Sequence, residues 1–483
     1  MSKTLRFVSL GSLLVVVATC AGSLAKSKAR GSWKPRAIPA YTGLDSGVPL
    51  AAALSPDGRR VAVLAIVPPS SQGAGPYPLT LQIWDADQLT LLTSREVAVP
   101  RQPQGESSSA DRELAPLGCV VRYAGNGGAL VVSEGGAQVG PEAGTSSLSR
   151  SQARLHVLAA DDLRELRSVD LELAPDPRTL GITDIQVSPG GDRIAVALSP
   201  IDFSVGFGNG APCQAFQGGE ARAYDSASGR ELWKAPFENG RIGGLGWAPD
   251  RSSLALTLQT GPGEDPVAQA FCPERKVDHN VLILDSASGQ VLSGLDTRDV
   301  AGPVCLGPRH EVFTAPYHFF YAQTSGEKAK VWNAQTGAVV RTIACSGRDV
   351  HDALVLSGDG KVLVGYVGKE KFGYSWRTMQ DLPENVDEKF AVWDARSGDL
   401  LHISPSFVPL THSAGGQSGS KLDLGWLPPA LRKLSDRLTR VQEAPGKPQL
   451  QVSADGSKIL VSWPWHGSPL IFEVPPTRGA HPE

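Results

Sequence analysis

Aromatic side chains gather in segments of this chain that show no strand-like alternation of apolar and polar residues. The densest are "PYHFFYA" from Pro316 and "KFGYSW" from Lys371. Large aromatic rings that cluster on a surface bring contact area at small entropic cost, which is typical of binding sites. The alternative is that these rings pack on one another as a cap over a channel. The binding interpretation names Phe207, Phe271, His318, Phe319, Phe320, Tyr321, Phe372, Tyr374, Trp376 and Trp426.

Patterns that could support catalysis are scarce. The chain contains no Gly-x-Ser-x-Gly, no His-Glu-x-x-His, no phosphate-binding loop and no EF-hand loop. Asp278 and His279 are adjacent and could exchange a proton, but a solvated pair is the more typical role. Asp87, Asp161 and Asp296 lie at hairpin ends, which favours turn capping over metal binding. We therefore expect no catalytic residue, no metal and no cofactor.

Two phrases recur along the chain and predict the elements that position these residues. "AAALSPDGRRVAVLAI" from Ala51 and "IQVSPGGDRIAVALS" from Ile185 each predict a strand, a tight turn and a second strand. "LQIWDADQLTLL" from Leu81 and "KFAVWDARSGDLL" from Lys389 predict the hairpin that follows. Alignment of the acidic position of the second phrase gives seven units of four strands, with Asp85, Ala159, Asp225, Asp285, Asn333, Asp394 and Glu473 in register.

Repeats of four antiparallel strands indicate a β-propeller, because one such sheet cannot bury both its faces whereas a ring of them can. The expected fold class is all-β: a seven-bladed β-propeller of four-stranded antiparallel blades, closed by an N-terminal strand within Arg36 to Gly43. Residues 405–447 are expected to form an insertion between blades. Within a propeller spanning 26–483, the expected blades lie near 44–98, 114–172, 180–236, 240–296, 300–344, 350–404, and 446–476 with 33–43.

The turns and hairpin ends resemble those of WD-repeat propellers, through "SPDG" and the pairs Trp84-Asp85, Trp332-Asn333 and Trp393-Asp394. That family also carries a Gly-His pair before the first strand, which only His351 approximates, and an Asp in a tight turn before the third strand. The resemblance implies a diverged bacterial WD-like propeller in which the family's internal hydrogen-bond tetrad is mostly absent.

A second likeness concerns "YDSASGRELWKAP" from Tyr224, which resembles the docking motif of pyrroloquinoline-quinone dehydrogenases. That family repeats the motif's Trp in blade after blade, whereas Trp233 is the one Trp at this position here. Quinoprotein-type oxidoreductase chemistry is therefore retained only as an alternative.

The predicted connections differ between the two rims of the propeller. The Asp-Gly and Ser-Gly turns are short and fall on one rim, whereas the connections from second to third strands fall on the other. The latter are long, for example "SPIDFSVGFGNGAPCQAFQGGE" and "GKEKFGYSWRTMQDLPENVDEK". Long irregular segments in compact domains commonly serve binding. We therefore expect the aromatic residues named above to share one elaborated rim.

The cysteines allow one disulfide prediction. Cys213 and Cys272 lie in second-to-third-strand connections of the third and fourth units, which emerge side by side on one rim, so a disulfide is expected. Cys119 and Cys305 lie in apolar runs and are expected to be buried thiols, whereas Cys345 has no evident partner.

The N-terminus is typical of an export signal. Lys3 and Arg6 precede an apolar run over 10–21, and small residues at Ser23 and Ala25 predict a signal peptide over 1–25. We expect a periplasmic or extracellular protein, with lipid anchoring through Cys20 as the less favoured alternative. No later segment is long and apolar enough to span a bilayer, so no transmembrane span is expected in the mature chain.

These features predict an exported, non-catalytic binding or scaffold propeller. The formal net charge of −3 gives no general attraction for nucleic acid. The expected partner is a protein or a cell-envelope component bound by the elaborated rim of a monomer. A small-ligand or glycan binder is the alternative, followed by the quinoprotein-type enzyme.

Overall fold

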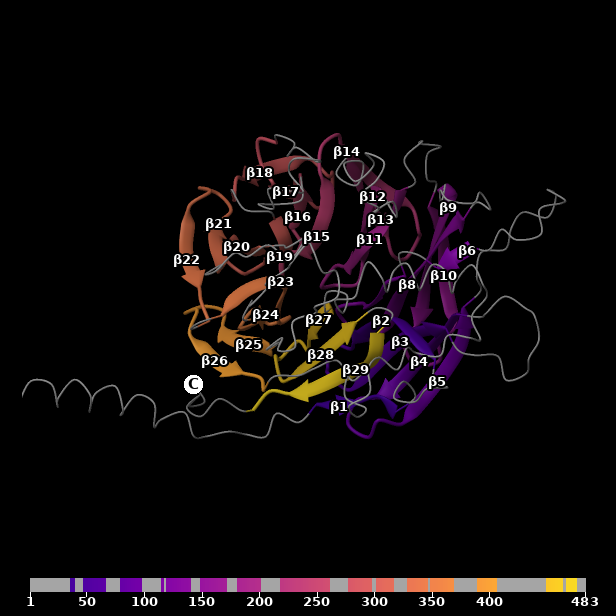
Figure 1. Cartoon of the computed structure of the whole chain (residues 1–483). Helices are drawn as coiled ribbons and strands as arrows, with labels where there is room; N and C mark the ends of the chain where they lie inside the picture. The colour runs from indigo at the N-terminus through magenta and orange to yellow at the C-terminus, as the bar shows by residue number, and fades with distance from the viewer. Residues whose placement is uncertain are drawn as a thin grey trace, which may run out of the picture.

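The structure of the protein is a computed structural model. It describes residues 35–39, 47–66, 79–97, 114–116, 119–139, 148–171, 180–200, 218–260, 277–297, 301–316, 328–345, 348–368, 389–405, 449–463 and 466–475. These residues form strands and turns and contain no α-helix. Figure 1 shows the strands as seven small sheets arranged in a ring, so the predicted all-β, seven-bladed propeller is confirmed.

Each sheet is one blade, and its antiparallel strands run from strand A at the centre of the ring to strand D at its outer edge. Blade 1 contains β2 (Val48–Leu54), β3 (Arg60–Ile66), β4 (Leu79–Asp85) and β5 (Leu91–Val97). Blade 2 contains β6 (Leu114–Pro116), β7 (Val121–Tyr123), β8 (Ala129–Val139), β9 (Leu148–Ala159) and β10 (Glu165–Leu171). Blade 3 contains β11 (Leu180–Val187), β12 (Arg193–Pro200), β13 (Gly219–Asp225) and β14 (Glu231–Phe237).

The remaining blades follow the same order. Blade 4 contains β15 (Arg241–Trp247), β16 (Ser253–Gln259), β17 (Val281–Asp285) and β18 (Val291–Leu295). Blade 5 contains β19 (Ala301–Leu306), β20 (Glu311–Pro316), β21 (Ala329–Asn333) and β22 (Val339–Ile343). Blade 6 contains β23 (Asp349–Leu356), β24 (Val362–Gly368), β25 (Lys389–Asp394) and β26 (Leu400–Ile403). Blade 7 contains β27 (Gln449–Val452), β28 (Lys458–Trp463), β29 (His466–Glu473) and β1 (Arg36–Ala37).

Blade 2 departs from the simple pattern in its strand A. This strand is interrupted, because β6 and β7 both pair with β8, in successive stretches of its register. The sheet therefore has five strands in four positions. The A strands of neighbouring blades contact one another all the way round the ring, and β27 contacts β2 to complete the circle.

The AB turn of blade 1, residues 55–59, shows why the Ser-Pro-Asp-Gly phrase recurs. Ser55 Oγ donates to Asp57 Oδ1 at 2.6 Å and accepts the N–H of Arg60 at 2.9 Å. Gly58 has φ 69°, a conformation that a residue without Cβ adopts at no steric cost. Equivalent bonds to a serine hydroxyl are donated by the N–H groups of Arg193, Val362 and Lys458.

The CD turns use a carboxylate or amide oxygen in the same way. Asp85 Oδ1 accepts the N–H groups of Asp87 at 2.8 Å and Gln88 at 2.6 Å. In blade 5, Asn333 Oδ1 accepts the two equivalent N–H groups, each at 2.9 Å. Either side chain fits because each offers an oxygen to the backbone of the turn. The two kinds of turn together form one rim, which we call the turn rim.

The hydrophobic core is divided among the interfaces between adjacent blades, which we call seams. Seven buried clusters are present, and each contains residues from two neighbouring blades. At seam 7/1, for example, Ile38 and Ile471 pack against Val63 and Trp84. Since each blade buries both faces only between two neighbours, the stability of the fold depends on a closed ring.

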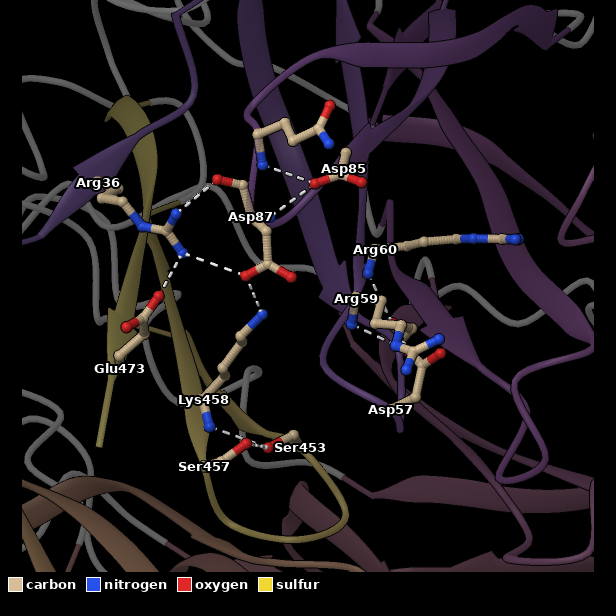
Figure 2. A network of polar contacts seen from close by, with 12 residues as sticks. Arg36, Asp57, Arg59, Arg60, Asp85, Asp87, Ser453, Ser457, Lys458 and Glu473 are labelled. Carbon is tan, nitrogen blue, oxygen red and sulfur yellow. Dashed lines mark hydrogen bonds and ion pairs between the residues drawn. The ribbon is translucent and has the colours of Figure 1, made fainter. Parts of the chain in front are cut away.

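The N-terminal strand closes the ring, as predicted. Arg36 and Ala37 of β1 pair with Ile471 and Leu470 of β29, and the Ile38 N–H donates to Pro469 O at 3.3 Å. Figure 2 shows the polar contacts beside this pairing: Arg36 bonds to Glu473 at 2.9 Å and to the carbonyl oxygen of Asp87 at 2.7 Å. Lys458 Nζ reaches the Asp87 carboxylate at 2.5 Å. The expected closing residues 40–43 lie outside the described residues.

Candidate functional site

The residues predicted to bind lie outside the part of the chain that the structure describes. This holds for every aromatic residue named for the elaborated rim and for both cysteines of the predicted disulfide: Phe207, Phe271, His318, Phe319, Phe320, Tyr321, Phe372, Tyr374, Trp376, Trp426, Cys213 and Cys272. Their roles stay predictions.

The described strands do fix where these segments begin and end. Except for the segment that contains Trp426, which joins β26 of blade 6 to β27 of blade 7, each joins strand B of a blade to strand C, and all the B strands run away from the turn rim. Segments 201–218, 260–280, 317–328 and 369–388 therefore start and finish at the rim opposite the turns. We call this rim, where B strands end and C strands begin, the BC rim.

Asp184 links the A strands of three consecutive blades. Its Oδ1 accepts Arg122 of blade 2 at 3.1 Å, and its Oδ2 accepts the N–H of Leu245 of blade 4 at 3.2 Å. Its own neighbour Ile185 donates a further N–H at 2.8 Å. The Arg122 and Asp184 side chains are only 19% and 16% exposed. The Asp184 carboxylate is paired with a guanidinium and accepts several N–H groups, so its role is to hold the inner strands of neighbouring blades together.

Cys305, on strand A of blade 5, is a thiol rather than a reactive thiolate. Burial raises its pKa to about 12. Its Sγ donates to Leu354 O of blade 6 at 3.5 Å. Burial also raises the pKa of Cys345. A thiol is nucleophilic only when ionised, so neither group is prepared for attack at neutral pH.

A chain of titratable side chains runs from the interior of blade 2 across seam 1/2, and the sequence did not point to it. His156 Nε2 lies 2.8 Å from Glu134 Oε2, and His156 Nδ1 lies 3.4 Å from Glu165 Oε1. Glu165 in turn pairs with Arg95 of blade 1 at 3.2 Å. The side chains of Glu134 and His156 are 2% and 7% exposed. Polar residues at core-facing positions of the apolar strands β8 and β9 were the available signal.

Side chains of one blade bond to the CD turn of the next at several seams. Arg60 donates to Ala160 O at 3.3 Å, and Arg341 donates to Ala395 O at 2.5 Å. Trp233 donates its indole N–H to Ser286 O at 3.0 Å. Asp87 and Asp161, expected above to cap turns, instead bond across seams to Lys458 and Arg60.

Trp233 therefore joins two blades, which is the kind of contact that a docking motif supplies. Arg167 and Arg341 occupy the register position of Trp233 in blades 2 and 5, opposite Val157 and Val331. Each of the three donates an N–H to the next blade. The shared requirement is a long donor rather than an indole.

The remaining candidates for acid–base chemistry or metal binding have no supporting contacts among the described residues. Asp278 and His279 are both exposed, and within the described residues no hydrogen bond joins them. Among those residues no group of three His, Cys, Asp or Glu side chains could hold a metal ion. The described residues also include no helix of the length and apolarity needed to cross a membrane.

No protein-family model and no curated protein matches the chain.

Proposed function

We propose that this chain is an exported, non-catalytic propeller that binds a protein or a cell-envelope component through its BC rim. In this proposal residues 1–25 direct export, and the mature protein acts as a monomer. The partner contacts the aromatic residues of the segments that start and end at that rim.

The observation that carries the proposal is the difference between the two rims. On the turn rim, successive blades use the same short hydrogen-bonded turns, and neighbouring AB turns bond to one another: the Ala454 N–H donates to Pro56 O at 2.7 Å. The BC rim receives segments such as 201–218 and 369–388, which follow no common length or sequence. A uniform scaffold that carries variable segments on one side is the usual organisation of a binding domain.

The non-catalytic part of the proposal has separate support. The polar groups of the inner strands are engaged in structural bonds, as Asp184 is with Arg122 and Leu245. The Cys305 thiol is protonated at neutral pH because burial raises its pKa to about 12. Catalytic groups need free hydrogen-bonding capacity and a suitable protonation state; the bonds of Asp184 use the first, and the protonated Cys305 thiol lacks the second.

We also propose a distant relationship to WD-repeat propellers. Support comes from Trp332 in strand C of blade 5, whose indole N–H donates to Thr314 Oγ1 in strand B at 2.9 Å. Trp84 and Trp393 occupy the same position before the CD turn, and both are buried. A strand bulge recurs at this position in blades 1, 5 and 6.

Recovery of partners from the native envelope fraction tests the proposal. The test variant replaces Phe319, Phe320 and Tyr321 by Ala. The matched control replaces Leu92, Leu292 and Val340 by Ala, since these apolar side chains are 50%, 60% and 51% exposed at the start of D strands, beside the turn rim. We expect the first variant to lose most of the recovered partner and the control to retain it, with equal circular dichroism spectra.

Two results would contradict the proposal. Full recovery with the BC-rim variant would show that the partner binds elsewhere, and equal loss with both variants would show non-specific apolar association. Export is tested separately by N-terminal sequencing of the protein from the envelope fraction. A mature chain that begins at Lys26 is expected, and an intact Met1 in the cytosol would exclude export.

A further inference from the structure

Seam 2/3 contains a cavity of about 340 Å³ at the turn rim. Its walls are the apolar side chains of Val131, Val157 and Val187, and its edges carry Ala129, Arg167 and Ser226. The volume falls within the range of small-molecule sites, and an apolar wall with a few polar groups at its edge is their usual lining. Figure 1 shows blades 2 and 3 as neighbours in the ring.

The cavity exists partly because a small residue begins strand B of blade 2. Ala129 of blade 2 occupies the register position of Arg60 in blade 1 and of Arg193 in blade 3. Each pairs with the residue that begins the CD turn of its blade, which is Ala159, Asp85 and Asp225 respectively. Arg60 and Arg193 both reach across their seams, to Ala160 O and Ser286 Oγ. The methyl group of Ala129 leaves that space empty at seam 2/3.

A second replacement enlarges it. Val187 ends strand A of blade 3, where it pairs with Ile194. The same position is Tyr123 in blade 2, which pairs with Leu130, and Trp247 in blade 4, which pairs with Leu254. Tyr123 and Trp247 are 8% exposed, and both belong to the clusters that fill their own seams. At these two positions seam 2/3 thus lacks both the guanidinium and the aromatic ring that its two neighbouring seams possess.

The polar edge of the cavity shows which atoms are open to a ligand. Ser226 and Ser286 are equivalent: each N–H donates to the preceding AB turn, and each Oγ donates to a carbonyl of that turn at 2.6 Å. Ser286 then also accepts two side-chain donors, the Trp233 indole on its carbonyl and the Arg193 guanidinium on its hydroxyl. Among the described residues no side chain donates to the carbonyl oxygen of Ser226.

Arg167 explains why this carbonyl is open. It occupies the position of Trp233, but its guanidinium donates to Ser228 O at 2.8 Å and not to Ser226 O. The exposed guanidinium remains at the edge of the cavity. A guanidinium beside an aromatic face attracts the ring.

We infer that the seam 2/3 cavity is a binding site for an aromatic ring with an N–H donor, of the indole class. The ring lies on Val131, Val157 and Val187, its N–H donates to Ser226 O as Trp233 does to Ser286 O, and Arg167 covers its outer face. The site is independent of the proposed BC-rim function, because it lies on the opposite rim. The ring can arrive as a free indole or as the tryptophan side chain of a polypeptide.

The test is calorimetric titration of the full mature chain with four probes. 3-Methylindole carries the ring and the N–H, whereas 1,3-dimethylindole carries the same ring with the donor blocked. We expect saturable binding of the first at one site and binding of the second weakened by about threefold or more, the effect of one hydrogen bond. N-acetyl-tryptophanamide and N-acetyl-phenylalaninamide test the ring as a polypeptide presents it. Binding of the tryptophan amide in preference to the phenylalanine amide would identify a polypeptide as a source, and binding of 3-methylindole alone would identify a free indole.

Variants locate the site. Val187→Trp should fill the cavity as Trp247 fills seam 3/4, and it should abolish binding. Ala129→Arg is a second filling variant, which restores the residue type of both neighbouring seams. As a positive control, Trp233→Ala opens the corresponding space at seam 3/4 and should add a second 3-methylindole site that raises the Tm of that variant.

Three results would overturn the inference. One is no saturable binding of 3-methylindole to the wild-type protein up to its solubility limit. Another is equal affinity for 3-methylindole and 1,3-dimethylindole, which would show that the ligand makes no hydrogen bond to Ser226 O. The third is unchanged binding in either filling variant with a native circular dichroism spectrum, which would place the site elsewhere.

Discussion

Arg36, in the first strand of the fold, donates to the backbone carbonyl of Asp87 at 2.7 Å, in the CD turn of blade 1. The same guanidinium bonds to Glu473 of blade 7 at 2.9 Å, so one side chain joins both blades of the closing seam. Figure 2 shows Lys458 and Arg36 meeting at the same carboxylate oxygen of Asp87. This lowers the pKa of Asp87, chiefly through the Lys458 hydrogen bond.

Closure of the ring should depend on apolar packing more than on this ion-pair network. Ile38 is fully buried at seam 7/1, so Ile38→Ala should lower the free energy of unfolding by about 2–5 kcal/mol. Arg36→Ala should cost under about 1 kcal/mol, because its partners Asp87 and Glu473 are 57% and 62% exposed. Urea denaturation of both variants is the measurement. An Arg36→Ala variant that is less stable than Ile38→Ala would refute this order.

Asp184 should be the most sensitive polar residue of the inner strands. Asp184→Ala leaves the Arg122 guanidinium and the Leu245 N–H without their carboxylate, and it should cost about 2–3 kcal/mol. Asp184→Asn is the matched control and should cost less, because the amide oxygen still accepts one of the two. The denaturation midpoints of the two variants are compared. Equal losses would mean that the acceptor oxygen retained by Asn contributes no stability.

Acid should weaken the CD turns. Hydrogen bonds from Ser228 and Ser288 lower the pKa of Asp225 and of Asp285 below the ordinary value of 3.8. A carboxyl group whose folded-state pKa is lowered contributes stability above its unfolded pKa, and that contribution is lost as pH falls through the folded value. The double variant Asp225→Asn and Asp285→Asn should therefore fold normally at pH 7, because Asn333 already forms the same turn in blade 5. It should lose less stability than wild type between pH 5 and about pH 2. Thermal denaturation across this range is the measurement. Identical acid profiles for the two proteins would contradict the assignment.

The predicted Cys213–Cys272 disulfide can be tested against internal controls. Cys305 and Cys345 should resist alkylation in the native protein at pH 8, because burial raises both their pKa values, and should react after denaturation. In protein purified from the envelope, Cys213 and Cys272 should resist alkylation even after denaturation until a reductant is added. Peptide mapping that recovers both as alkylated thiols without reduction would exclude the bridge.

Local sequence was enough to predict the repeat and its closure. The Ser-Pro-Asp-Gly phrase encodes a turn within five residues, so Ser55, Asp57 and Gly58 reveal it without reference to the rest of the chain. The closing role of β1 followed from counting strands in the last unit. The WD-like kinship and the aromatic binding set stay predictions.

Contacts across the seams could not be predicted in the same way. Whether Arg193 or Ala129 faces a CD turn matters only because the ring places that turn beside it, and the turn belongs to a different repeat. The ion pair between Arg95 of blade 1 and Glu165 of blade 2 likewise depends on the ring placing two repeats side by side. The interruption of strand A in blade 2 also has no counterpart in the other units to signal it.

The pairing of β1 with β29 sets the order in which the molecule can be completed. Arg36 and Glu473 are separated by 437 positions, so the first strand to leave the ribosome must remain unpaired until the last has been made. During that interval the face of blade 1 that packs at seam 7/1, including Val63 and Trp84, has no neighbour to cover it. A contact of such long range also slows folding, because the entropy of bringing distant segments together is lost before the contact forms. Biogenesis therefore includes an open-ring stage in which chaperones have an apolar surface to bind.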